Sequence, residues 1–291
     1  MIPFIKAHAC GNDFLIISED AAEGYDKSLL TQRLCDRNTG IGADGIEFFA
    51  WINETATSSN LISARAQLYN ADGSIAEISG NGTRCVAAWM AEDSNSQSGD
   101  ELSVETDAGV RICKVQEFRS SDEIGPTTLI TTDMAVPEFQ EQTVELADGT
   151  QIDGVYVNMG NPHFVIVLGD ADPANPDFSI NDRSWEDVGE EICYHADFPE
   201  QTNVEFVILQ RSGSGLRDHV LMRIYERGVG PTTSSGTGTS AAATAMIGVY
   251  GGASPMEVST IGGIQTVEWA GDGQPLYLTG PATLIARGEA W

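Results

Sequence analysis

The sequence predicts an α/β protein of two pseudo-symmetric lobes, each a mixed sheet or barrel wrapped around a central helix. One observation is a glycine-rich pattern that occurs twice, as Ser79-Gly-Asn-Gly-Thr83 and Ser235-Gly-Thr-Gly-Thr239, each time before a run of small residues. The other observation is that most of the remaining chain reads as β-strands. An internal repeat of this kind indicates two related structural units.

Two further pairs of segments match in the same order along the chain. Residues 104–110 resemble residues 258–264, and residues 11–17 resemble residues 160–166 more loosely. A length of 291 residues is enough for two domains of moderate size. We therefore expect a first lobe formed by residues 1–130 with 280–291, and a second lobe formed by residues 131–279.

β-Branched runs and period-two alternation predict the strands, and capping signals predict fewer helices. The strands are expected at residues 14–17, 46–51, 64–69, 102–106, 110–115, 154–157, 164–168, 204–210, 220–225, 265–269 and 276–278. Helices are expected at residues 26–37 (with a start signal at Ser28), 82–92, 182–194 and 238–250. Polar stretches at residues 53–60 and 93–100 are typical of loops.

The charge balance excludes some classes of partner. Fifteen Lys and Arg stand against 43 Asp and Glu, which gives a formal net charge of −28. Recognition of nucleic-acid phosphates or of an anionic membrane needs clustered basic residues, so neither partner is expected. Two interpretations of the acidity remain open. Either the negative charge keeps an ordinary soluble enzyme from associating by self-repulsion, or the acidic surface is an adaptation to high salt.

Targeting and metal-binding signals are absent from the sequence. The start has no basic region before a long apolar stretch, and no segment is apolar enough to span a membrane. The five cysteines contain no Cys-x-x-Cys pair, which favours a reduced, cytoplasmic protein. The four histidines show no metal-ligand spacing, so no metal site is expected.

Both Ser-Gly-x-Gly turns directly precede a helix of small residues. Glycines leave backbone N–H groups uncovered, and a helix N-terminus attracts anions. Because no lysine follows, the pattern does not indicate a nucleotide-binding loop. Two such turns that face each other in a cleft between the lobes would bind a carboxylate. Taken singly, Ser79 and Ser235 are also well explained as helix N-caps.

Six motifs in order resemble the diaminopimelate epimerase family, a group of amino-acid racemases and epimerases that work without pyridoxal phosphate. They are His8-Ala-Cys-Gly-Asn-Asp-Phe14 (with Ala9 where Gly is usual), Asp36-Arg-Asn-Thr-Gly-Ile-Gly-Ala-Asp-Gly45, Tyr69-Asn-Ala-Asp-Gly-Ser74, Met159-Gly-Asn-Pro-His163, Tyr225-Glu-Arg-Gly-Val-Gly230 and Leu278-Thr-Gly-Pro-Ala282. The resemblance covers nearly the whole chain. It implies an isomerase that interconverts LL- and meso-diaminopimelate, a step of lysine biosynthesis, by α-proton exchange.

The resemblance also implies roles for individual residues. His163 and Glu226 match the groups that assist the family's two catalytic cysteines. Positions that hold the small amino-acid substrate match Asn12, Asn70, Asn161, Asn203 and Arg227, and the carboxylate cradle matches Gly80, Asn81, Gly236 and Thr237. No cofactor and no metal is implied. Because the family is often dimeric, the resemblance allows a homodimer.

The two catalytic cysteine positions of the family are occupied by Ser79 and Ser235. A serine hydroxyl is a much weaker acid than a thiol and needs an adjacent base to act. Four interpretations stay open. The serines are an engineered replacement, or they relay protons for His163 and Glu226. Alternatively, the protein is a one-base isomerase or dehydratase of the same superfamily, or it binds an amino acid without turnover.

Overall fold

A computed structural model describes residues 1–52, 61–76, 78–120, 125–169, 176–210 and 219–291. The predicted loop at residues 53–60 lies outside these ranges. The chain divides into two compact units, one formed by Met1–Asp133 with Thr279–Trp291 and the other by Met134–Leu278. Every helix within the described ranges is too short or too polar to cross a membrane.

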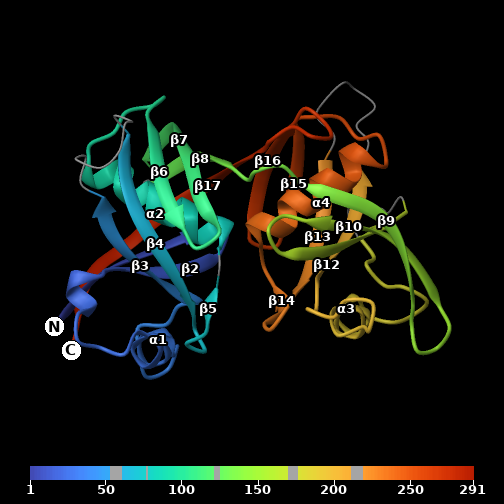
Figure 1. The fold of residues 1–291 in the computed structure, drawn as a ribbon, viewed down its shortest axis with the longest axis horizontal. Helices are drawn as coiled ribbons and strands as arrows, with labels where there is room; N and C mark the ends of the chain where they lie inside the picture. The colour runs from blue at the N-terminus through green and yellow to red at the C-terminus, as the bar shows by residue number, and fades with distance from the viewer. Residues whose placement is uncertain (53–60, 77, 121–124, 170–175, 211–218) are drawn as a thin grey trace. The chain divides into compact units, whose positions relative to one another are not determined.

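The first unit is an eight-stranded closed barrel (Figure 1). Its strands pair in the ring order β17–β1–β2–β3–β4–β6–β7–β8, and β8 pairs with β17 again. The bounds are β1 Ile2–Ala9, β2 Asn12–Ser18, β3 Gly45–Ile52, β4 Ile62–Asn70, β6 Glu101–Thr106, β7 Gly109–Ser120, β8 Pro126–Asp133 and β17 Leu276–Ala290. The short strand β5 (Ile75–Ala76) pairs with the end of β4.

Helix α2 (Gly80–Asp93) is the core of this barrel. Every residue from Gly80 to Ala91 is buried, and the helix packs against strands on several sides of the ring. A helix that is buried on all faces needs small or apolar residues all round. Ala87, Ala88 and Ala91 meet this need, and they join barrel side chains such as Leu102 and Ile130 in one apolar cluster.

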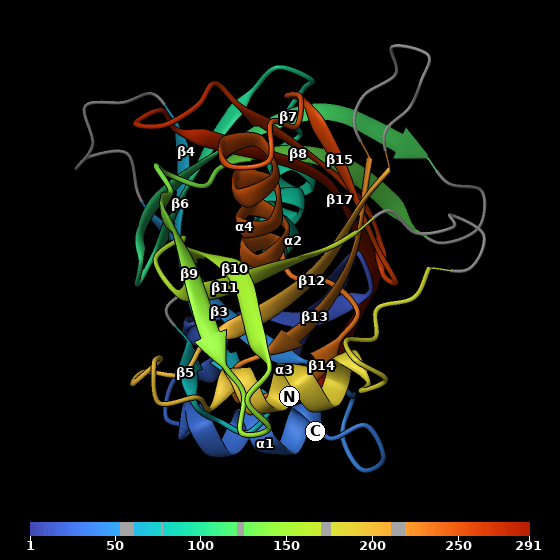
Figure 2. The ribbon, with the colours of Figure 1, turned by 90° about the vertical axis from the view of Figure 1, so that its right-hand side faces the viewer.

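The second unit wraps its strands around helix α4 (Gly236–Gly248), as Figure 2 shows. The pairing order is β9–β10–β11–β12–β13–β15–β16, and β14 pairs with β13. The bounds are β9 Glu138–Glu145, β10 Gln151–Asn158, β11 Pro162–Leu168, β12 Asn203–Gln210, β13 His219–Glu226, β14 Gly230–Thr232, β15 Met256–Thr260 and β16 Gly263–Trp269. Residues 236–246 of α4 are all buried.

The two units share one topology, which confirms the predicted pseudo-symmetry. In each, an antiparallel pair (β1–β2 or β10–β11) is followed by a parallel partner (β3 or β12), an antiparallel partner (β4 or β13) and a second parallel partner (β6 or β15). Parallel neighbours need a crossover connection. Helices α1 (Lys27–Cys35) and α3 (Trp185–Cys193) lie in the first crossover of each unit, and α2 and α4 lie in the second.

The structure corrects some details of the predicted elements. All four predicted helices form, but α1 begins after Asp26, whose side chain accepts the N–H of Leu29, and not at Ser28. Strands β1, β8, β9 and β15, the short strands β5 and β14, and most of β17 were not predicted. A short 3-10 helix at Asp20–Ala22 was also missed. Much of β9 is exposed and polar, so it lacks the apolar alternation that marks a half-buried strand.

Candidate active site

Each Ser-Gly-x-Gly serine is the N-cap of a central helix. The Oγ of Ser79 accepts the N–H of Gly82 at 3.1 Å, and the Oγ of Ser235 accepts the N–H of Gly238 at 3.2 Å. The capping role expected of each serine is therefore confirmed. The predicted cradle residues Gly80, Asn81, Gly236 and Thr237 form the first turns, where backbone N–H groups have no acceptor within the helix.

The hydroxyl of Ser235 has a second hydroxyl beside it. The Oγ1 of Thr237 lies 3.3 Å from the Oγ of Ser235, and both side chains belong to residues that are less than one-tenth exposed. A buried hydroxyl pair next to a positive helix end can pass a proton and still keep its hydrogen bonds.

A chain of polar side chains brings Asn12 and Asn81 together in the first unit. Asn81 donates from Nδ2 to the Oδ1 of Asn12 at 3.2 Å, and Asn12 donates to the Oδ2 of Asp44 at 2.7 Å. The fully buried Arg84 donates to the Oδ1 of Asn81. These contacts orient both amides. Sequence reasoning singled out the two asparagines but did not find Arg84 or Asp44.

Asp13 anchors the other side of this network. Arg37 donates to Asp13 at 2.7 Å and to Asp44 at 2.7 Å, and the Nζ of Lys6 lies 3.0 Å from Asp13. Burial raises the pKa of Asp13, but the hydrogen bonds from Arg37 and Lys6 outweigh burial and lower it overall. Asp13 therefore stays ionised and holds the beginning of β2 in place.

In the second unit, the His163 ring contacts the side chains of both Asn161 and Glu205. The Nδ1 of His163 lies 2.6 Å from the Oε1 of Glu205, and its Nε2 lies 3.0 Å from the Oδ1 of Asn161. The side chains of His163 and Glu205 are fully buried. Strands β11 and β12 run parallel with His163 opposite Asn203, which places Glu205 two residues further along β12. Burial raises the pKa of the Glu205 carboxyl, and His163 acts in the opposite direction.

Glu205 packs against the first turn of α4. A Cβ added at Gly238 would lie 2.6 Å from the Cδ1 of Ile224 and 2.8 Å from the Oε1 of Glu205. The second glycine of the turn therefore leaves room for the carboxyl group. Sequence reasoning missed Glu205. The available signal was a single acidic residue inside the apolar run Asn203-Val-Glu-Phe-Val207.

Asn203, Glu226 and Arg227 lie near one another at the ends of β12 and β13. Asn203 donates from Nδ2 to the carbonyl of Pro162 at 2.9 Å and accepts the N–H of Arg227 at 3.0 Å. The guanidinium of Arg227 donates to the carbonyl of Glu200 at 3.0 Å. Thr232 donates its hydroxyl to a carboxyl oxygen of Glu226. In the first unit, Asn70 at the end of β4 donates to Ser74 at 3.1 Å.

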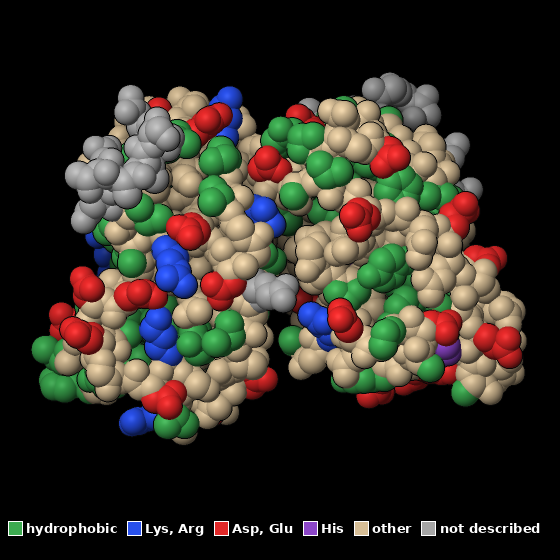
Figure 3. Space-filling view, viewed as in Figure 1, with side chains coloured by type: hydrophobic (Ala, Val, Ile, Leu, Met, Phe, Trp, Pro, Cys, Tyr) green, Lys and Arg blue, Asp and Glu red, His purple; other side chains and the backbone are tan. Residues whose placement is uncertain are grey.

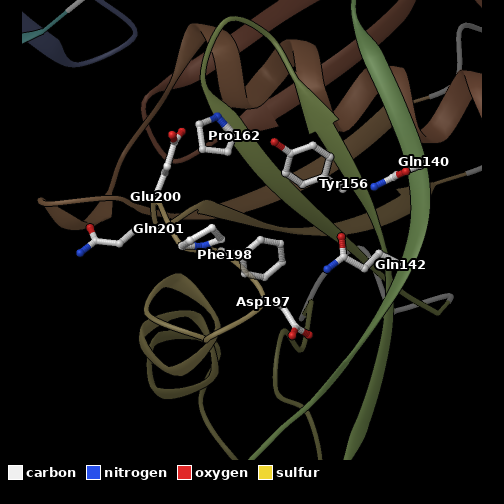
Figure 4. A pocket seen from close by; sticks show the side chains of 9 residues that line it. Gln140, Gln142, Tyr156, Pro162, Asp197, Phe198, Glu200 and Gln201 are labelled. Carbon is white, nitrogen blue, oxygen red and sulfur yellow. The ribbon is translucent and has the colours of Figure 1, made fainter.

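A shallow pocket of about 350 Å³ lies beside this group (Figure 4). The rings of Tyr156 and Phe198 stack with centroids 6.3 Å apart, and Gln140 and Gln142 line one side. Pro162 and Glu200, whose carbonyls accept from Asn203 and Arg227, also line it. None of the predicted site residues does. In the described ranges, no three His, Cys, Asp or Glu side chains gather as a metal site.

Comparison with known proteins shows the family of this chain. The sequence model of the diaminopimelate epimerase family matches residues 4–130 and 155–285. The chain belongs to the diaminopimelate epimerase family. It is 32% identical to the diaminopimelate epimerase of Halothermothrix orenii over 305 residues, which covers 99% of this chain and 97% of that protein. It is also 32% identical to the enzyme of Pseudomonas fluorescens, with 99% of each chain covered.

Solved structures show the same fold at lower sequence identity. A phenazine biosynthesis protein of the PhzF family from Bacillus anthracis superposes with a TM-score of 0.65 at 15% identity, and the alignment covers 100% of this chain and 99% of that one. Membership of the family, whose curated members are isomerases, supports an epimerase-like isomerase function for this chain.

Proposed function

We propose that this family member interconverts LL- and meso-diaminopimelate in the cytoplasm, as a step of lysine biosynthesis, by α-proton exchange without a cofactor. The observation that carries the proposal is the repeated capped helix: in each unit a serine caps a buried central helix whose first-turn N–H groups have no acceptor within the helix. His163 and Glu226 act as the bases, and the hydroxyls of Ser79 and Ser235 relay the protons.

The remaining predicted residues hold the substrate in this proposal. The first-turn amides of Gly80, Asn81, Gly236 and Thr237 bind the reacting carboxylate and stabilise the negative charge that develops when the α-proton leaves. The amino groups and the distal carboxylate are bound by polar side chains, namely Asn12, Asn70, Asn161, Asn203 and Arg227. Arg227 is well suited to a carboxylate because its guanidinium offers several fixed donors.

Incubation with LL- or meso-diaminopimelate in D₂O, followed by NMR, tests the proposal. We expect the α-proton signal to disappear while the two isomers interconvert. If neither isomer loses its α-proton at any pH between 6 and 9, the chain does not catalyse this reaction. Binding measured in the same samples would then indicate a homologue that holds the amino acid without turnover.

A second function, a one-base isomerase or dehydratase acting on another amino acid, is favoured by one observation. The buried histidine of the second unit has no counterpart in the first, because the strand register places Phe14 at the position equivalent to His163. A single strong base would exchange the α-proton on one face only. NMR that shows deuterium uptake with retained configuration, or loss of a β-substituent, would support this alternative.

A further inference from the structure

His163 is the most completely enclosed titratable group among the candidate site residues. Its two ring nitrogens face the Oε1 of Glu205 at 2.6 Å and the Oδ1 of Asn161 at 3.0 Å. The side chains of His163 and Glu205 have no exposed area. The other carboxyl oxygen of Glu205, Oε2, has no hydrogen-bond partner among the described residues. The proposed bases and substrate-binding residues do not include Glu205.

The contacts of His163 define how many protons the pair holds. With the Asn161 amide oriented so that Oδ1 faces Nε2, the oxygen can only accept, and this orientation assigns a hydrogen to Nε2. The 2.6 Å contact holds a second proton between Nδ1 and Oε1. The pair is therefore neutral as a whole, either as imidazolium with carboxylate or as imidazole with carboxylic acid. A neutral pair is the form that burial favours.

We propose that Glu205 is the positioning residue that makes His163 an exchangeable proton store for the α-proton transfer. This role rests on the proposed function. When the pair gives up the Nε2 proton, Nδ1–H remains bonded to a carboxylate, and the pair carries one negative charge in a buried site. Burial disfavours that net charge. In one direction Glu226 takes the α-proton and the pair delivers its Nε2 proton to the other face of the α-carbon, each through a serine hydroxyl. In the reverse direction the anionic pair takes the α-proton back through the same hydroxyl, and the bonding electrons stay on the substrate.

The first unit contains a natural comparison for this pair. Glu47 on β3 corresponds to Glu205 on β12, because Phe14 pairs with Gly45 as His163 pairs with Asn203. Glu47 also lies against the second glycine of its turn, Gly82. The first unit therefore keeps the buried carboxyl but has a phenyl ring in place of the imidazole. Replacing Glu47 changes a buried carboxyl without touching His163.

The experiment compares the wild-type protein with Glu205→Gln and, as the matched control, Glu47→Gln. Imidazole ¹⁵N and N–H signals of His163, assigned with His163→Asn, report its ring protons without any need for substrate. We expect the wild-type Nε2–H and the bridging proton to give way to a single ring proton in Glu205→Gln. Glu47→Gln should keep the wild-type spectrum. Identical His163 signals in the wild type and Glu205→Gln would overturn the inference.

A kinetic arm tests whether the pair serves the reaction. We expect Glu205→Gln to lower kcat for α-proton exchange at least about 10-fold with KM unchanged, because positioned acid–base groups contribute about 10²- to 10⁴-fold. The low-pH limb of its rate profile should move to lower pH. If Glu205→Gln folds poorly, Gly238→Ala supplies a second variant, because the added Cβ would lie 2.8 Å from the Oε1 of Glu205 as well as 2.6 Å from the Cδ1 of Ile224. A folded variant whose pH–rate profile does not shift would refute the positioning role of Glu205. A wild-type protein that is inactive but shows the expected His163 NMR signals would refute only the proposed function.

Discussion

Gly82 in α2 leaves room for the carboxyl group of Glu47. A Cβ added at Gly82 would lie 2.0 Å from the Oε1 of Glu47 and 3.3 Å from the Cβ of Ser79. The second glycine of the first turn is therefore required by the close approach of a strand side chain. The same relationship between Gly238 and Glu205 occurs in the second unit. The repeat thus preserves a buried carboxyl at each helix N-terminus.

We expect Gly82→Ala to destabilise the protein by about 1–3 kcal/mol, because a methyl group cannot enter this space without moving the carboxyl or the helix. Urea unfolding measures the change. Gly169→Ala is the matched control, since a Cβ there meets nothing within 4 Å and its cost should stay below about 0.5 kcal/mol. Equal losses in the two variants would show that the contact with Glu47 is unimportant.

Glu47 gives stability a characteristic pH dependence. Burial, assisted by the charge of Asp107, raises the pKa of Glu47 from 4.5 to about 8. Between these values the folded state keeps a proton that the unfolded state has lost, so the free energy of unfolding falls as pH rises. The contribution is up to about 1.4 kcal/mol per pH unit, and it levels off above pH 8. We expect Glu47→Gln to remove this part of the slope in unfolding experiments from pH 5 to pH 9. Parallel curves for the two proteins would contradict the assignment.

Placing thiols at the two capped turns should increase α-proton exchange. A helix N-terminus lowers the pKa of a cysteine, so Ser79→Cys with Ser235→Cys supplies groups that act near neutral pH. Each change also removes a serine cap, which lowers the free energy of unfolding by about 1 kcal/mol. The control is Ser79→Ala with Ser235→Ala, which should lose similar stability without gaining activity. A folded double-cysteine variant that exchanges no α-proton would indicate that the scaffold serves another substrate.

The surface charge predicts a response to salt. Carboxylates are scattered over the face shown in Figure 3, and the formal net charge is −28. Screening shortens from about 10 Å at 0.1 M to about 3 Å at 1 M salt, so KCl should relieve self-repulsion. We expect Tm to rise between 0.1 M and 2 M KCl at pH 7, and to rise less at pH 4, near the sequence pI of about 4.2. A Tm that does not rise at pH 7 would argue against adaptation to high salt.

Local patterns were sufficient to predict the repeat, the four helices and most of the core strands. Glycine-rich turns and alternating apolar residues act over a few neighbouring positions, so they can be recognised without a fold. The sequence predicted only residues 276–278 of β17, where apolar and polar residues alternate. The strand continues to Ala290 because it pairs with β1 in the barrel. The exposed strand β9 is defined by its partner β10 and not by its own composition.

Only the tertiary structure brings together the side chains that complete the site. Ser79 and Ser235 could be recognised as caps from their own turns, because a cap bonds within three residues. His163 and Glu205 are 42 residues apart, and only the parallel pairing of β11 with β12 brings their atoms to 2.6 Å. The pKa of Glu47 is raised because the barrel encloses its carboxyl group and excludes water. Charge states and proton sharing depend on burial and on distant partners, which a linear pattern does not contain.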